Sequence, residues 1–115
     1  MFDQITIIGC GLIGSSIFKA LKKKSSIKKI ITFDNNKSAM EVIKKDNLSD
    51  KIVSSSAEAV KNSDLVLIST PSSSFTSVIG EIKESLKSGS ILTDTLSVKK
   101  VFEVKLDDVN WIPSH

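Results

Sequence analysis

The chain has 115 residues, of which 40% are hydrophobic, and its formal net charge is +3. This length suits one domain with a hydrophobic core. No run of about 18 apolar residues predicts a membrane-spanning helix, and the chain opens without the regions of a signal peptide. All sixteen basic residues are lysines, spread along the chain, which disfavours a nucleic-acid interface. Cys10 is the only cysteine, so we expect a reducing, cytoplasmic location.

Short apolar runs alternate with segments of helical periodicity. Ile5 to Ile8, for example, are apolar or β-branched and end at a glycine, which is typical of a buried strand. The predicted strands are 5–8, 30–33, 51–53, 65–68, 91–93 and 109–112. The predicted helices cover about 12–24, 37–45, 75–86 and 98–106, and a short helical turn, capped by Ser56, runs through Val60. This alternation predicts an α/β fold of the Rossmann type. We expect a doubly wound parallel sheet of about six strands in the order 3-2-1-4-5-6, with helices on both faces.

The first motif with chemical meaning is Gly9-x-Gly11-x-x-Gly14, between the first strand and the first helix. Gly9 permits a tight turn, Gly11 lets a pyrophosphate approach the backbone, and Gly14 lets the helix lie close to the sheet. The amides at the start of the helix would hold the anion, with Leu12 and Ile13 beside it. A glycine-rich turn without a ligand is the alternative.

An acidic residue, Asp34, ends the second predicted strand, 20 positions after Gly14. A carboxylate there accepts hydrogen bonds from ribose hydroxyls and repels a 2′-phosphate. Since Asn35, Asn36 and Lys37 follow, with no arginine, the pattern favours NAD over NADP as cofactor. A helix cap made by Asp34 or Asn36 is compatible with this role.

Three further places carry polar residues at predicted strand or chain ends. Ser69, Thr70 and Pro71 follow the fourth strand, at the edge where ligands lie in this topology, although a plain strand-ending turn gives the same pattern. Ser97 follows the fifth strand and would serve equally as a helix cap. His115 is the only histidine, and a single terminal histidine is more often incidental than catalytic. No metal site is predicted.

Taken together, four stretches resemble the prephenate and arogenate dehydrogenases of tyrosine biosynthesis. They are 7–16 with the glycine loop, 64–71 ending in Ser-Thr-Pro, 92–99 with Asp-Thr-Leu-Ser-Val-Lys, and 112–115, Ile-Pro-Ser-His. The resemblance spans essentially the whole chain, and the last two stretches are its most specific part. One departure is Leu96, where the family usually has glycine.

The resemblance implies an NAD-dependent oxidoreductase that oxidatively decarboxylates a cyclohexadienol, prephenate or arogenate. His115 matches the family's catalytic histidine, which accepts the proton of the ring hydroxyl while hydride leaves the ring. Ser97 matches the serine that orients this histidine and contacts the substrate. The family's helical domain, which dimerises and supplies arginines, would lie outside this chain. We therefore expect residues 1–115 to be the NAD-binding domain of a homodimeric enzyme and to be inactive alone.

Two other interpretations are compatible with the glycine loop. The first is another Rossmann oxidoreductase, similar to pyrroline-carboxylate reductases or 3-hydroxyacid dehydrogenases, and Ser97 and His115 argue against it. The second is a non-enzymatic NAD(H)-binding module, which would bind NADH tightly without a catalytic histidine. Binding of nucleic acid or of a membrane is not expected under any of these interpretations.

Overall fold

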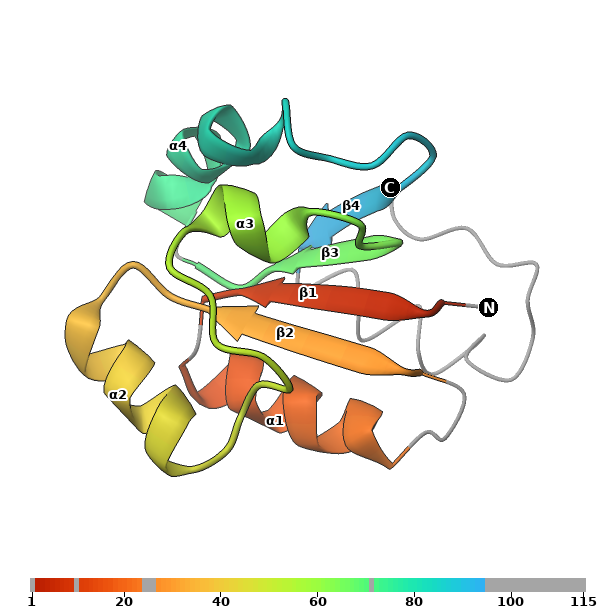
Figure 1. The fold of residues 1–115 in the computed structure, drawn as a ribbon. Helices are drawn as coiled ribbons and strands as arrows, with labels where there is room; N and C mark the ends of the chain where they lie inside the picture. Colours follow the sequence, from red (N-terminus) through yellow and green to blue (C-terminus); the bar gives the residue numbers. More distant parts are fainter. Residues whose placement is uncertain (1, 10, 24–26, 71, 95–115) are drawn as a thin grey trace.

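A parallel sheet of four strands forms the centre of the computed structural model, which describes residues 2–9, 11–23, 27–70 and 72–94. The strands are β1 (Gln4–Ile8), β2 (Lys29–Phe33), β3 (Leu65–Ile68) and β4 (Ile91–Asp94). Their order is β2-β1-β3-β4, so the chain leaves β1 first toward one side of the sheet and then toward the other (Figure 1). These four strands correspond to the first, second, fourth and fifth predicted strands. Their order confirms the predicted doubly wound order for these strands.

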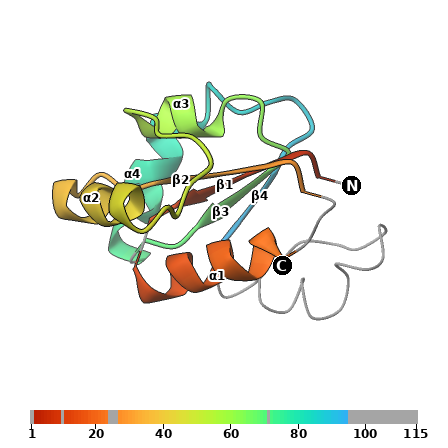
Figure 2. The same ribbon diagram turned by 60° about the horizontal axis from the view of Figure 1, so that its bottom comes forward.

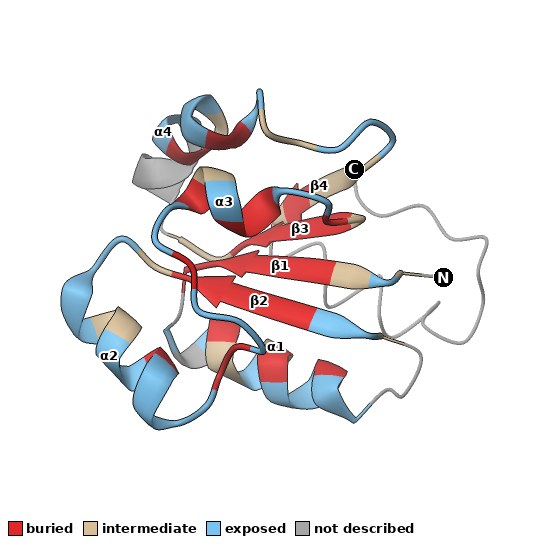
Figure 3. Cartoon of the chain, in the orientation of Figure 1, coloured by how far each residue is buried: buried red, intermediate tan, exposed pale blue. Residues whose placement is uncertain are grey.

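Helices cover both faces of this sheet (Figure 2). They are α1 (Leu12–Lys22), α2 (Lys37–Lys45), α3 (Ser56–Val60) and α4 (Ser72–Ile82). Phe18 and Leu21 of α1 pack with Ile5 and Ile7 on one face. On the opposite face, α3 and α4 pack on a second cluster that includes Ile68. All four residues of β3 are buried, as expected for a central strand covered on both sides (Figure 3).

The register of the sheet brings the carboxyl ends of the strands to one edge. Ile8 of β1 lies opposite Phe33 of β2 and Ile68 of β3, and Ile68 lies opposite Asp94 of β4. The reversal of strand order falls between β1 and β3. This crevice is where ligands bind in open parallel sheets.

The predicted strand at 51–53 is wrong, because the segment beside β2 makes no regular ladder. Ser49 Oγ accepts from the N–H of Thr32 at 2.8 Å, and Asp50 Oδ2 accepts from the N–H of Ile30 at 2.7 Å. The N–H of Asp50 in turn donates to the carbonyl of Ile30 at 2.8 Å. Side chains thus occupy the outer N–H groups of β2, while Val53 still packs in the core. A hydrophobic pattern alone does not reveal this replacement.

One carboxylate, Asp64, joins the opposite end of the sheet. Its Oδ2 accepts from the N–H groups of Asp3 at 2.8 Å and Gln4 at 3.1 Å, and its Oδ1 accepts from Lys87. Burial alone would raise the pKa of Asp64, but the hydrogen bonds from Lys87, Gln4 and Asp3 together lower this pKa below its ordinary value. Asp64 therefore stabilises the fold in its charged form.

The predicted helix at 98–106 and the predicted strand at 109–112 lie outside the described residues. Within the described part, none of the helices is long and apolar enough to cross a membrane.

Candidate nucleotide-binding site

Gly9 makes the turn out of β1. Its φ is +100°, a backbone conformation that favours glycine, and its N–H donates to the carbonyl of Phe33 at 2.7 Å. A Cβ at this position would lie 2.9 Å from the methyl carbon of Thr70 and 3.0 Å from the backbone of Ser69. The ends of β1 and β3 therefore approach each other too closely for any larger residue.

Gly14 brings the first turn of α1 against the same turn. An added Cβ would overlap the carbonyl oxygen of Gly9 and would lie 3.5 Å from Oγ of Ser69. The helix consequently begins directly above the carboxyl end of β1. Gly14 thus has the packing role that the sequence predicts for it.

Gly11, by contrast, faces open space. It is the N-cap of α1, with no side-chain cap, and apart from its chain neighbours no atom of the described residues lies within 4 Å of an added Cβ. The N–H groups at the start of a helix lack acceptors within it and carry the positive end of its dipole. The first turn of α1 also contains no acidic residue. An anion can therefore approach the backbone here, as the glycine spacing predicts.

An exposed apolar residue, Ile13, stands on this turn with 56% of its surface accessible. Exposure of a large aliphatic side chain is not unusual in itself. Here it lies at the helix start beside Gly11, and its contact with a bound cofactor stays a prediction. The side chain of Leu12 lies outside the described part of the structure.

Asp34 follows β2 at the same edge of the sheet. Its Oδ1 accepts from the N–H of Asn36 at 2.8 Å, and its own N–H donates to Sδ of Met40 at 3.3 Å. Asn36 is the N-cap of α2, and its side chain accepts from the N–H of Ala39 at 3.0 Å. The carboxylate that the sequence assigns to the ribose is thus placed by the start of α2.

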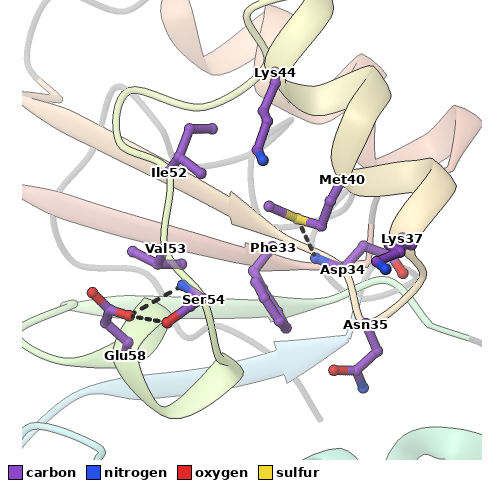
Figure 4. A pocket seen from close by; sticks show the side chains of 10 residues that line it. All are labelled: Phe33, Asp34, Asn35, Lys37, Met40, Lys44, Ile52, Val53, Ser54 and Glu58. Carbon is purple, nitrogen blue, oxygen red and sulfur yellow. Dashed lines mark hydrogen bonds between the residues drawn. The ribbon is translucent and has the colours of Figure 1, made fainter.

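A cavity of about 480 Å³ opens beside Asp34, between the end of β2, α2 and the segment leading into α3. Figure 4 shows Phe33 and Val53 on its inner wall, and Lys44 and Ile52 at the end away from Asn35. The complete lining consists of Phe33, Asp34, Asn35, Lys37, Met40, Lys44, Ile52, Val53, Ser54 and Glu58. An apolar wall with polar groups at its rim suits a heterocyclic base attached to a sugar.

Sequence reasoning did not find Ser54 and Glu58 at this cavity. The N–H and hydroxyl of Ser54 both donate to Oε1 of Glu58, at 3.1 and 3.0 Å. These two hydrogen bonds lower the pKa of Glu58, desolvation opposes them, and the charges of Lys51 and Lys61 add to the lowering. Their place at the site depends on the path of residues 51–58 beside β2. No local sequence pattern predicts that path.

At the end of β3, the N–H of Ser69 donates to the carbonyl of Ile8 at 2.7 Å. The next residue, Thr70, has a buried hydroxyl oxygen with no hydrogen-bond partner among the described residues. Buried hydroxyls are usually paired, so this one is suited to a ligand that enters beside Gly9. Ser69 and Thr70 therefore lie where the sequence predicts, next to the glycine loop.

Pro71, Ser97 and His115 lie outside the described residues, so their predicted contacts stay predictions. Among the residues that are described, none of the groupings of histidine, cysteine and carboxylate side chains could hold a metal ion.

The fold and this edge of the sheet define a Rossmann-type nucleotide-binding domain. The sequence profile described as prephenate dehydrogenase, nucleotide-binding domain, matches residues 17–115. Because this match covers most of the chain, the chain belongs to the family of prephenate dehydrogenase nucleotide-binding domains. The matched range begins just after the glycine loop, so that loop is identified by its own geometry.

A cyclohexadienyl dehydrogenase from Zymomonas mobilis is 32% identical over 119 residues, which is 100% of this chain and 41% of that protein. The chain thus spans less than half the length of this relative. The structure of prephenate dehydrogenase from Aquifex aeolicus, in complex with hydroxyphenyl propionate and NAD+, has a TM-score of 0.71 and 23% identity. That similarity covers 82% of this chain and 33% of the other.

The fold itself is shared more widely. A 3-hydroxyisobutyrate dehydrogenase from Mycobacterium tuberculosis also has a TM-score of 0.71, with 19% identity, over 90% of this chain and 35% of the other. Architecture alone therefore does not separate the predicted dehydrogenase from a 3-hydroxyacid dehydrogenase relative. The family profile makes that separation.

Proposed function

We propose that this chain is the NAD-binding domain of a prephenate or arogenate dehydrogenase. The observation that carries the proposal is the open backbone at Gly11, at the start of α1, between Asp34 and Thr70. A dinucleotide needs this combination: amides for its pyrophosphate, a carboxylate for one ribose and room between them. The Aquifex aeolicus structure, which was determined with NAD+, supports the choice of dinucleotide.

In this proposal, different residues of the site bind different parts of the dinucleotide. The N–H groups that follow Gly11 hold the pyrophosphate, and Ile13 covers it from the helix. Asp34 accepts hydrogen bonds from the ribose hydroxyls of the adenosine half, and the cavity behind Phe33 receives adjoining parts of that half. Ser69, Thr70 and Pro71 contact the other half across the crevice.

For the whole protein, we propose oxidative decarboxylation of a cyclohexadienol, with prephenate or arogenate as substrate. NAD, when bound, supplies the hydride acceptor. His115 would accept the proton of the ring hydroxyl, which requires a neutral imidazole at working pH. Ser97 would orient that imidazole. A helical domain beyond residue 115 would complete the substrate pocket and form a homodimer, so the chain alone binds cofactor without turnover.

Titration calorimetry of the chain with NAD and with NADP tests the cofactor assignment. We expect NAD to bind and NADP to bind at least tenfold more weakly, since a 2′-phosphate would meet the Asp34 carboxylate. A preference for NADP, or no binding of either, would overturn it. Gly80→Ala is a matched control, because Gly80 lies in α4, far from the glycine loop in sequence, and an added Cβ would meet none of the described side chains within 4 Å.

The catalytic assignment is tested in the protein extended by its remaining domain. His115→Asn should lower kcat by about 10²- to 10⁴-fold with prephenate or arogenate, while NAD affinity stays the same. Ser97→Ala should lower kcat less. Unchanged turnover in the His115 variant would contradict the proposed chemistry and leave the cofactor assignment standing.

A further inference from the structure

The carboxylate of Asp34 is tied to the start of α2. The N–H of Asn36 donates to its Oδ1 at 2.8 Å. Asn36 itself is held, because its side chain caps Ala39 at 3.0 Å and its carbonyl accepts from Met40 at 3.0 Å. The orientation of the acidic side chain therefore follows from the helix cap, which fixes its torsion angles.

The backbone of Asp34 is tied from the other side. Its N–H donates to Sδ of Met40 at 3.3 Å, and Met40 packs against both hydrophobic clusters, one on each face of the sheet. Movement of Asp34 thus requires movement of α2 against the core. The two contacts together hold both the backbone and the carboxylate of one residue.

We infer that Asn36 is a positioning residue whose backbone N–H sets the preference of this site for NAD over NADP. The inference deepens the proposed function and rests on it. A carboxylate that is already oriented loses little freedom when it accepts ribose hydroxyls. Because the same carboxylate cannot rotate away, it stays close to a 2′-phosphate and repels it electrostatically.

The surroundings of Asp34 explain why a looser carboxylate would change the preference. Lys37 and Lys44 line the same cavity as Asp34, and both belong to α2. If Asp34 turned aside, these ammonium groups would attract a 2′-phosphate. Discrimination between the cofactors therefore depends on the direction of the carboxylate as well as on its presence.

Two substitutions at Asn36 separate the backbone hydrogen bond from the cap. Asn36→Pro and Asn36→Ala both remove the side chain that caps Ala39, and only the proline also removes the N–H. The φ of Asn36 is −77°, which proline adopts. We expect the proline variant to bind NAD about five- to tenfold more weakly than the alanine variant. NADP should bind equally or more tightly, so the ratio of the dissociation constant for NADP to that for NAD falls.

Equal ratios in the two variants would overturn the inference. If the wild-type chain bound no NAD, the proposed function would fail as well, and that outcome is visible before any variant is made. Thermal unfolding of both variants checks that they are equally folded.

Met40→Leu is an independent test of how the position of Asp34 affects cofactor preference, and it applies if the proline variant does not fold. Leucine keeps the volume of Met40 but cannot accept from the N–H of Asp34. We expect the ratio to fall about twofold or more without loss of structure. An unchanged ratio in the Met40 variant would contradict the inference.

Discussion

Gly14 lies so close to Gly9 that a single added carbon on Gly14 would overlap the carbonyl oxygen of Gly9. The contact joins the first turn of α1 to the end of β1. It is a requirement of the fold, because it is a contact between two elements of the chain itself. Gly11, between them, has no such contact with any described residue. The three glycines of one motif therefore have separable roles in folding and in binding.

Alanine at Gly11 should change NAD binding, whereas alanine at Gly14 should change the stability of the fold. Gly11→Ala should leave the melting temperature nearly unchanged and weaken NAD binding at least tenfold, since its Cβ would enter the open space that we propose for the pyrophosphate. Gly14→Ala should destabilise the fold by about 1–3 kcal/mol, because the helix start must move. Calorimetry and thermal unfolding measure the two quantities. Equal loss of stability in both variants would contradict this separation.

Removal of the charge at Asp34 should alter cofactor preference. Serine at this position is neutral, but its hydroxyl still accepts from the N–H of Asn36. Asp34→Ser should therefore weaken NAD binding by about tenfold and strengthen NADP binding, with little change in stability. Titration with both dinucleotides checks this. An unchanged preference would show that another group recognises the ribose.

The buried hydroxyl of Thr32 should reduce stability. Thr32 is fully buried, and within the part of the chain that the structure describes its Oγ1 has no hydrogen-bond partner. Thr32→Val should raise the free energy of unfolding by about 1 kcal/mol. Thr6 is the matched control, since it is equally buried but its hydroxyl donates to the carbonyl of Ala59 at 2.6 Å. Thr6→Val should lower stability by about 1–3 kcal/mol, and urea unfolding should show the opposite signs.

Asp64 should make stability depend on pH in the acidic range. Because the pKa of Asp64 is lowered by folding, its contribution is present above its ordinary value of 3.8 and is lost as pH falls through the folded value. Asp64→Asn should lower the free energy of unfolding at neutral pH by about 1–2 kcal/mol. The difference between variant and wild type should shrink below about pH 4. A difference independent of pH would exclude the charged form as its cause.

Much of the fold could be predicted because local pattern and burial agree. Strand 65–68 and helix 37–45 were predicted with their observed bounds. The short helical turn was predicted to end at Val60, as observed, but its N-cap is Ser55 and not the predicted Ser56. The glycine loop was predictable because its spacing reports on backbone geometry. Residues 51–53 were mistaken for a strand, since Val53 is buried like a strand residue while Ser49 and Asp50 supply the hydrogen bonds.

The candidate site could be predicted only where the spacing of residues along the sequence identifies a functional residue. Asp34 stands at a fixed distance from the glycine loop, and that spacing identifies it. Its contacts with Asn36 and Met40 depend on how α2 turns back on the sheet, and Glu58 reaches the cavity from a segment 24 positions further along. These relationships arise from packing, which a periodic pattern does not encode.

The side chains of Ser49 and Asp50 also determine how the sheet can grow. By occupying the outward N–H groups of Thr32 and Ile30, they prevent another strand from pairing along β2. Among the described strands, β4 is the other edge. Extension of this sheet, whether by later residues of the chain or by a second molecule, is therefore directional, and intermolecular strand addition during folding would have to begin at β4.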